Sequence, residues 1–352
     1  MSTGRIRPIP IILTILIAAA AGRFGFPYPR PSPPGERAPV VAPKLRFGKG
    51  RLLTPTDIRL SGNELIVLDE VAPMNPEDNV FVVFGLDGRF KSQFGRGGQG
   101  PGEFGQAHAF EVKGNILYVL DSFKQCIQLF SAADKSYLRT IRYGSEQVFT
   151  TPHDFAVLDG GGFVLAKIHA IRGNKALFPV GPDGKPGTAF LDVNPAFENE
   201  ADFRAKANNP DPETCRKDYS NLGYLESTGQ RIYYLPWLKN EILAFHLDGK
   251  PAGRIALPLT SIETTVKIVK ENGFLNIERR LNYGLACDGD RLWVVSRDED
   301  GMSILYEISA GQVTERLRAK EALEDFAVAG QTLYATDQES GEVLVYAIPS
   351  VR

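Results

Sequence analysis

The histidine and aspartate side chains of this chain are the ones that could do chemistry. Five of them lie just before, or at the start of, short apolar segments that recur along the chain. The five are Asp57, His108, His153, Asp154 and Asp325. Side chains of these types can ligate a divalent cation or act as general acid and base. The three aspartates occupy equivalent places, which favours a structural role as acceptors for backbone N–H groups. The two histidines are less repetitive and are therefore the better functional candidates.

No established catalytic motif accompanies these residues. The sequence contains no G-x-S-x-G, no H-E-x-x-H and no acidic loop of the EF-hand type. Gly95–Gly102 has a spacing similar to G-x-G-x-x-G, but no helical pattern follows it, and a phosphate-binding loop requires one. Trp237 and Trp293, with Tyr233 and Tyr234, could form a surface on which a sugar stacks. Trp293 alternates within an apolar strand, however, and is rather expected to be packed between blades.

Composition and charge narrow the classes of function. The 352 residues are 43% hydrophobic and 23% charged, as in an ordinary soluble protein, and the formal net charge is -2. A near-neutral chain without a run of like charges is not expected to bind nucleic acid. Cys126, Cys215 and Cys287 have no metal-ligand spacing, and no disulfide is expected. Cys215 lies in a polar segment, where it could be exposed.

Residues 1–21 have the pattern of a secretory signal peptide. Two arginines precede an apolar stretch, Ile9–Ile17, and four alanines follow it. The stretch is shorter than the ~20 residues that a membrane-spanning helix needs, so cleavage is expected rather than retention as an anchor. Residues 22–43 are rich in proline and predict an extended linker. The protein is therefore expected to be periplasmic or extracellular, with no membrane span after cleavage.

From residue 44 onward a strand-turn-strand pattern recurs six times. The second strand of each copy is rich in β-branched and aromatic residues. These strands are ELIVLD (64–69), ILYVLD (116–121), FVLAKI (163–168), RIYYLP (231–236), RLWVVS (291–296) and TLYATD (332–337). Each follows a turn signal, such as Gly62 or Gly114, where glycine supplies the positive φ that tight hairpins require.

A first strand with one fixed apolar position precedes each turn. In the six copies the position is Ile58, Phe110, Phe155, Tyr224, Leu285 and Phe326. In four copies it lies seven residues before the second residue of the next strand. A third strand follows in every copy and a fourth in several, and repeats of ~40–50 residues with four strands are typical of propeller blades. The sequence therefore predicts an all-β, six-bladed β-propeller of four-stranded antiparallel blades over residues 44–352.

The sixth copy ends near Ile348, which leaves no room for its fourth strand. Lys44–Lys49 precedes the first copy and is expected to supply the missing strand. Pairing of the N-terminal strand with the last blade would close the ring and remove two open sheet edges.

Three segments of the second copy, Gly95–Phe104, Leu117–Asp121 and Ile127–Phe130, resemble the NHL repeat. More broadly, the chain is similar to the bacterial six-bladed propellers with NHL-like blades. The resemblance implies a fold that usually serves binding or scaffolding, and it carries over no active site. The loop glycines are expected to let the chain cross the propeller face, and Phe104 to fill the space between blades. Arg96 and His108 are the side chains in this region most worth testing.

Long connections are expected to decorate one face of the propeller. Four segments map to it: Glu70–Asn79, Gly95–Ala107, Asp192–Asn221 and Pro258–Asn282. The third of them is polar and predicts a lid or mobile loop. Within the fourth, Ser261–Leu281 has apolar residues at helical spacing and predicts a small amphipathic helix on the rim. One-sided decoration makes this face the expected working face.

Two classes of function fit these observations. The first is an exported binding or scaffold protein, a monomer without a cofactor, that engages a protein, peptide or glycan on the loop-rich face. Its candidate binding residues are Asp57, Arg96, His108, His153, Asp154 and Asp325. The alternative is a metal-dependent lactonase or lyase, with a divalent cation held at the channel mouth by some of the aspartates and His153. Binding is favoured because the sequence has no catalytic constellation.

Overall fold

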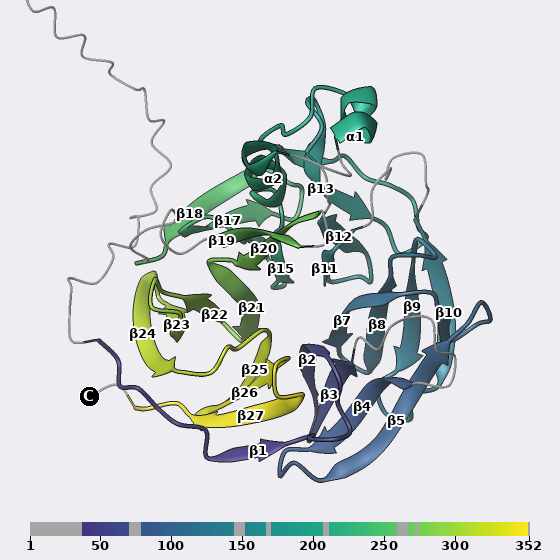
Figure 1. Cartoon of the computed structure of the whole chain (residues 1–352). Helices are drawn as coiled ribbons and strands as arrows, with labels where there is room; N and C mark the ends of the chain where they lie inside the picture. The colour runs from purple at the N-terminus through teal and green to yellow at the C-terminus, as the bar shows by residue number, and fades with distance from the viewer. Residues whose placement is uncertain are drawn as a thin grey trace, which may run out of the picture.

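The strands form six antiparallel blades arranged around a central axis (Figure 1). The computed structural model describes residues 37–69, 79–143, 152–166, 170–206, 211–258, 267–271 and 274–350. The expected signal peptide, most of the linker and residues 70–78 of the first long connection lie outside these ranges. No helix among the described residues is long and apolar enough to cross a membrane. The predicted six-bladed propeller is confirmed.

The first three blades follow the chain in order from the inner to the outer strand. Blade 1 consists of β2 (Pro55–Ser61), β3 (Glu64–Asp69), β4 (Asn79–Gly85) and β5 (Phe90–Gly97), with the short β6 (Glu103–Phe104) parallel to β5. Blade 2 consists of β7 (Ala107–Lys113), β8 (Ile116–Asp121), β9 (Cys126–Ser131) and β10 (Tyr137–Arg142). Blade 3 consists of β11 (Asp154–Val157), β12 (Phe163–Ala166), β13 (Lys175–Val180) and β14 (Phe190–Asp192).

The last three blades repeat the same order. Blade 4 consists of β15 (Gly223–Ser227), β16 (Arg231–Pro236), β17 (Glu241–His246) and β18 (Pro251–Ala256). Blade 5 consists of β21 (Asn282–Asp288), β22 (Arg291–Arg297), β23 (Ser303–Ser309) and β24 (Gln312–Ala319). Blade 6 consists of β25 (Phe326–Ala329), β26 (Thr332–Asp337), β27 (Glu342–Ala347) and the N-terminal β1 (Leu45–Phe47).

The N-terminal strand closes the ring as predicted. β1 pairs antiparallel with β27, with Leu45 opposite Val345 and Phe47 opposite Val343. The ring of Phe47 lies 5.0 Å from that of Phe84 in blade 1, so β1 also ties the last blade to the first. Contacts begin a few residues earlier, because the Val41 N–H donates to the Arg318 carbonyl of β24 at 2.8 Å.

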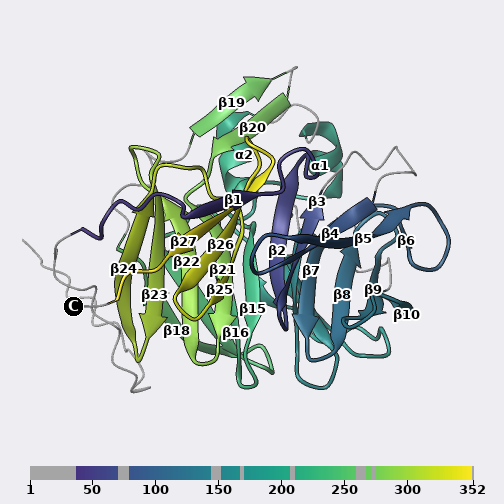
Figure 2. The same cartoon turned by 90° about the horizontal axis from the view of Figure 1, so that it is seen from below.

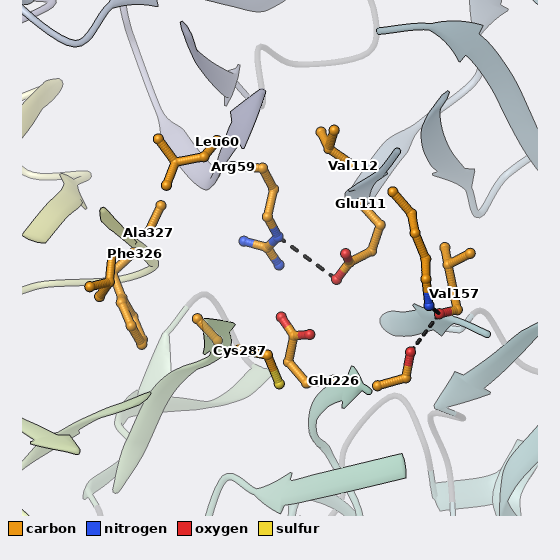
Figure 3. Close-up of a pocket in the computed structure, with 13 residues that line it drawn as sticks. Arg59, Leu60, Glu111, Val112, Val157, Glu226, Cys287, Phe326 and Ala327 are labelled. Carbon is orange, nitrogen blue, oxygen red and sulfur yellow. Dashed lines mark hydrogen bonds and ion pairs between the residues drawn. The ribbon is translucent and has the colours of Figure 1, made fainter. Parts of the chain in front are cut away.

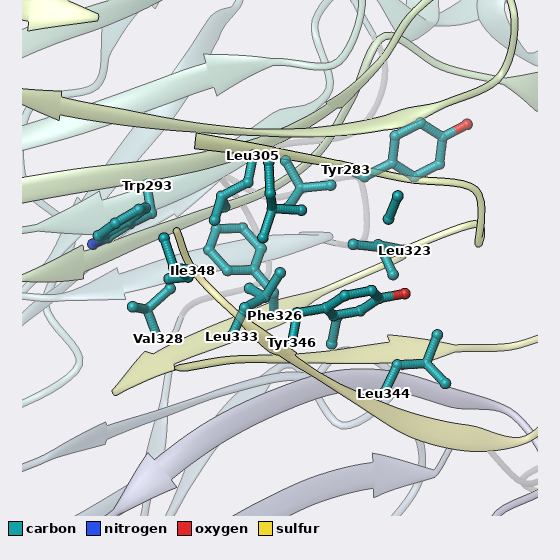
Figure 4. Close-up of a cluster of buried hydrophobic side chains, with 14 residues drawn as sticks. Tyr283, Trp293, Leu305, Leu323, Phe326, Val328, Leu333, Leu344, Tyr346 and Ile348 are labelled. Atoms are coloured by element: carbon teal, nitrogen blue, oxygen red, sulfur yellow. The ribbon is translucent and has the colours of Figure 1, made fainter. Parts of the chain in front are cut away.

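The hydrophobic core lies between neighbouring blades. Between blades 5 and 6, Trp293, Leu305, Phe326 and Tyr346 interdigitate and are almost fully buried (Figure 4). Between blades 1 and 2, the Phe104 ring lies 5.6 Å from both Phe81 and Phe130, as the expected interblade plug. The predicted core position of Trp293 is confirmed, since none of its surface is exposed.

Two insertions cover one face of the ring, which we call the decorated face. They contribute α1 (Glu200–Lys206) and α2 (Pro212–Tyr219) before blade 4, and the hairpin of β19 (Lys267–Glu271) and β20 (Phe274–Arg279) before blade 5. Figure 2 shows all four elements on the same side of the propeller. The expected concentration of insertions on one face is thus present.

The local structure of both insertions differs from the sequence-based expectation. The helix predicted over Ser261–Leu281 is wrong, because its described part forms the antiparallel pair β19–β20, with Glu271 opposite Phe274. The two intervening residues are Asn-Gly in the sequence, the strongest short hairpin signal. Where the structure describes it, the predicted loop over Asp192–Asn221 contains the two short helices α1 and α2. Asp211 caps α2 by accepting bonds from two backbone N–H groups.

The three cysteines are free, as expected. Cys215 is buried on α2, so its expected exposure is wrong. Its side chain lies on the inward side of a helix that contacts β20. A polar segment can still bury individual residues when it folds as an amphipathic helix.

Candidate functional site

Each inner strand has one buried anchor residue, and the residues on either side of the anchor face the central axis. The anchors are Ile58, Phe110, Phe155, Leu225, Leu285 and Phe326. The prediction of Tyr224 as the anchor of blade 4 is wrong. Leu225 pairs with Tyr234 in the way that Phe110 pairs with Val119, and Tyr224 therefore takes the axial position before the anchor.

The three equivalent aspartates connect neighbouring blades. An oxygen of Asp57 accepts a hydrogen bond from the Phe110 N–H at 3.0 Å, Asp154 accepts one from the Leu225 N–H at 2.7 Å, and Asp325 accepts one from the Ile58 N–H at 2.9 Å. In each case the donor is the anchor of the next blade around the ring. The structural role inferred from their equivalence is therefore present in the molecule.

Arg59 occupies the axis and separates two pockets. Its guanidinium lies 2.5 Å from Asp57 and 2.6 Å from Asp325. The decorated-face pocket, of about 220 Å³, lies at the starts of the inner strands. The opposite-face pocket, of about 240 Å³, lies at their ends. Arg59 contributes to the lining of both pockets.

Burial dominates the electrostatics of the axial carboxyls. It raises the pKa of Asp57 well above the ordinary range, against the opposing charge of Arg59 and with the support of nearby Asp325. Burial also raises the pKa of Asp154 to about 7, although its hydrogen bond from the Leu225 N–H opposes the shift. Asp154 can therefore hold a proton near neutral pH, which an ordinary surface aspartate would not.

Trp237 lines the decorated-face pocket. Its ring makes an edge contact with His153 at 5.6 Å and lies 6.1 Å from Tyr224 and 6.4 Å from Tyr219 of α2. The guanidinium carbon of Arg280 lies 4.5 Å from the Trp237 ring centre, a cation–π contact. The pocket thus presents an aromatic wall beside a fixed cation.

The last residues of both insertions are hydrogen-bonded to the backbone of Trp237. The Trp237 N–H donates to the carbonyl of Leu222, the end of the helical insertion, at 2.8 Å. The Trp237 carbonyl accepts from the N–H of Leu281, the end of the hairpin insertion, at 3.0 Å. The insertions therefore position the tryptophan, and a propeller without them would lack this arrangement.

Among the buried nitrogens of this pocket without a hydrogen-bond partner in the described residues, which also include Arg59 Nε, two belong to aromatic rings in contact with each other. They are Nε1 of Trp237 and Nδ1 of His153, both buried. The other ring nitrogen of His153 lies 2.6 Å from the Gly223 carbonyl oxygen and 3.0 Å from its nitrogen. Burial lowers the pKa of His153 to about 3, so the imidazole is neutral and Nδ1 can donate or accept according to the tautomer.

A charged network fixes the far side of the pocket. Glu324 accepts from Arg280 at 2.7 Å and from Arg297 at 3.2 Å, so one carboxylate holds two guanidinium groups. Arg297 in turn lies 3.8 Å over the Tyr283 ring. The opposing charges and rings restrict the rotation of Arg280, which keeps its position beside Trp237 defined.

Five of the six predicted binding residues meet at the decorated-face pocket. They are Asp57, His108, His153, Asp154 and Asp325. Arg96 does not line either pocket, because it forms an exposed ion pair with Glu103 at 2.6 Å. Sequence reasoning missed Arg59, Tyr224 and Arg280, and it assigned Trp237 no definite place. The seven-residue spacing of the anchors could have identified Arg59 and Tyr224, as flanking residues of an anchor.

The axial residues are not arranged as metal ligands. In the ranges that the structure describes, no group of three or more His, Cys, Asp and Glu side chains could hold a metal ion. The three aspartates point their oxygens at backbone N–H groups of neighbouring blades rather than at one point.

Fold and site together define a six-bladed propeller with a tryptophan-centred axial pocket. A family model described as a 6-bladed beta-propeller matches residues 51–162. This agrees with the architectural part of the resemblance inferred from the sequence, and the assignment to NHL repeats remains a prediction. A search of curated proteins gave no match.

Solved structures with similar folds have very different sequences. A Bacteroides fragilis protein whose name marks it as a candidate for export matches with a TM-score of 0.52 and 12% identity, over 90% of this chain and 95% of that one. An inactive virginiamycin B lyase from Staphylococcus aureus matches with a TM-score of 0.51 and 12% identity, over 87% and 99%. A chain of the mitotic checkpoint complex matches with a TM-score of 0.53 and 9% identity, over 93% and 98%. At these identities the similarity establishes the fold alone.

Proposed function

We propose that this chain is an exported binding protein that captures a peptide, protein or glycan on its decorated face. A polar group of the ligand enters the decorated-face pocket and contacts Trp237. The observation that carries the proposal is the pair of buried ring nitrogens, Nε1 of Trp237 and Nδ1 of His153, without partners among the described residues. Buried polar groups in native proteins are normally hydrogen-bonded, so each atom that lacks a partner identifies a place for a ligand atom or a water.

The chemistry of the pocket defines what such a ligand must offer. Trp237 Nε1 is a donor only, and Arg280 carries further N–H groups, so the ligand needs acceptor oxygens. The wall of Trp237 and Tyr224 favours a flat apolar face next to those oxygens. A sugar ring has both features, and so does a peptide side chain or terminus. The small volume, about 220 Å³, admits one such group and leaves the remainder on the surface.

Export is proposed from the N-terminal sequence. Positive residues, an apolar stretch and four alanines in succession are the three parts of a secretory signal. Purification from the periplasm or medium and determination of the mature N-terminus would test it. A mature protein that still begins at residue 1 inside the cell would contradict this part of the proposal.

Array screening with matched variants tests the binding proposal. The purified chain is applied to glycan and peptide arrays in parallel with Trp237→Phe, which removes the ring N–H and little volume. Leu247→Ala provides the control, because Leu247 is 39% exposed, follows β17 at the end away from the decorated face and lies outside both pockets. The proposal predicts ligands retained by Leu247→Ala and lost or weakened about tenfold in Trp237→Phe. Equal retention by both variants would refute it.

A further inference from the structure

The opposite-face pocket is separate from the proposed ligand site and lies at the other end of the axis. Its volume is about 240 Å³. The ends of the inner strands form its walls, and Figure 3 shows the acidic side chains Glu111 and Glu226 directed toward its centre, with Arg59 across from them. None of these three residues belongs to either insertion.

Both cations at this pocket already have acidic partners. Arg59 is paired with Asp57 at 2.5 Å and Asp325 at 2.6 Å, on the decorated side. Lys113 donates from Nζ to the Val157 carbonyl at 2.8 Å and lies 2.7 Å from Asp159. Lys113 is thus paired with Asp159, and Arg59, which already serves two aspartates, adds only a longer ion pair with Glu111 at 3.8 Å.

Glu111 and Glu226 are left without full compensation. Glu111 Oε1 lies 3.8 Å from Arg59 Nε, beyond hydrogen-bonding distance, and this buried oxygen has no hydrogen-bond partner among the described residues. Glu226 is 9% exposed, its side chain is hydrogen-bonded to the Cys287 thiol, and it forms no ion pair with any residue that the structure describes. Its carboxylate points into the gap between Arg59 and Glu111, above the Cys287 side chain (Figure 3). Burial, with the support of Glu111, raises the pKa of Glu226 well above its ordinary range against the attraction of Arg59, so a cation that entered this gap would stabilise the ionised form of this carboxyl.

The rest of the pocket is apolar. The wall residues are Leu60, Val112, Val157, Ala286, Phe326, Ala327 and Val328. Such walls would cover a short chain of methylene groups, while the two carboxylates lie where a charged head would be placed. A calcium ion takes six to eight oxygen ligands, more than the carboxyls of Glu111 and Glu226 can supply. An ammonium needs only acceptors for its three N–H groups.

We propose that the opposite-face pocket binds a small aliphatic amine. Its ammonium group lies between Glu111 and Glu226, and its alkyl chain contacts the apolar walls. The site is distinct from the decorated-face pocket and does not depend on the function proposed for that pocket. Burial raises the pKa of Glu111 to about 7, and protonation of this carboxyl would compete with the amine. The groups that face the two carboxyls are Arg59, Lys113, Asp154, Cys287 and Asp325.

Isothermal titration of the full chain with n-butylamine tests the site. We expect binding of n-butylamine at a pH of about 8, and no binding of 1-butanol, which matches its shape without the charge. Glu226→Gln and Glu111→Gln should each weaken amine binding at least about tenfold, because each removes a charge-assisted hydrogen bond. Trp237→Phe should leave it unchanged, which separates this site from the proposed ligand site.

The outcomes that would overturn the proposal are equally specific. They are no binding of n-butylamine, equal binding of 1-butanol, no effect of Glu226→Gln, or displacement of the amine by calcium chloride. Replacement of an uncompensated buried carboxylate by its neutral isostere should not harm folding, and melting curves would verify this. The unaltered chain gives a second measurement, since its affinity for the amine should fall as the pH is lowered below about 7.

Discussion

Replacement of Glu111 by glutamine should stabilise the protein at mildly alkaline pH but not at mildly acidic pH. Burial raises the pKa of Glu111 from 4.5 to about 7, against the attraction of Arg59 and with the support of Asp325. The unfolded chain releases this proton near pH 4.5, while the folded chain holds it to about pH 7. Stability is therefore lost as the pH rises through this window, and the loss is complete above it. Because one pKa unit corresponds to ~1.4 kcal/mol, the full loss is about 3 kcal/mol.

Urea unfolding of the two proteins at pH values of about 5 and 8 measures this effect. Glu111→Gln should exceed the parent by up to about 3 kcal/mol at the higher pH and by far less at the lower one. Glu64→Gln is the matched control. Partial burial acts to raise the pKa of Glu64, but hydrogen bonds from Lys135 and Lys91 outweigh it and lower the pKa below 4.5. The ionised Glu64 therefore stabilises the folded protein at every pH above 4.5, and this contribution is lost only at lower pH. An equal stability difference between Glu111→Gln and the parent at both pH values, or a larger one at the lower pH, would refute the reasoning.

Three further predictions follow from the fold and the axial site. Deletion of Lys44–Lys49 removes β1 and the contact of Phe47 with Phe84, so it should cost at least about 3 kcal/mol; an unchanged melting temperature would contradict the ring closure. Leu225→Ala should lower the free energy of unfolding by about 2–5 kcal/mol because it empties an anchor position between blades, whereas Tyr224→Phe should lower it by about 1 kcal/mol or less. If urea unfolding gave the reverse order, Tyr224 would be the anchor of blade 4, as the sequence predicted. Elemental analysis of the dialysed protein should find no stoichiometric divalent metal, and a 1:1 metal content lost on Asp325→Asn would support the lactonase or lyase alternative.

The blade architecture is predictable from the sequence because its signals are local and repeated. Alternating β-branched and aromatic residues identify each strand, and turn glycines separate the strands. Gly62 and Gly114 adopt φ values of +57° and +61°, the positive values that the hairpin turns require. The closing strand was also predictable, since the last copy lacks a fourth strand and a propeller with open edges would expose unpaired backbone groups.

The register of blade 4 shows what a stricter use of spacing would have added. Tyr224 precedes Ile232 by eight residues and Leu225 precedes it by seven, and seven is the spacing in four other copies. Both residues are apolar enough to serve as an anchor, so residue type alone does not distinguish them. The pairing of Leu225 with Tyr234 decides the register and places Tyr224 at the axis.

The composition of the axial pockets could not be predicted from local pattern. Arg280 belongs to an insertion, and its position beside Trp237 depends on Glu324, 44 residues away in the chain. The hairpin β19–β20 contains apolar residues that also fit a helical period, and only the Asn-Gly pair between its strands distinguishes the two structures. Sites built from insertions and long-range ion pairs require the tertiary structure.

Intrinsic tryptophan fluorescence is the most direct measurement of the proposed binding at the decorated face. The chain has two tryptophans, Trp237 in the pocket and Trp293 in the core between blades 5 and 6. Titration of a ligand selected on the arrays should shift the emission of the unaltered protein and leave that of Trp237→Phe, which retains only Trp293, unchanged. An identical shift in both proteins, or saturable binding to the unaltered protein without any change in emission, would contradict the assignment of the decorated-face pocket as the ligand site.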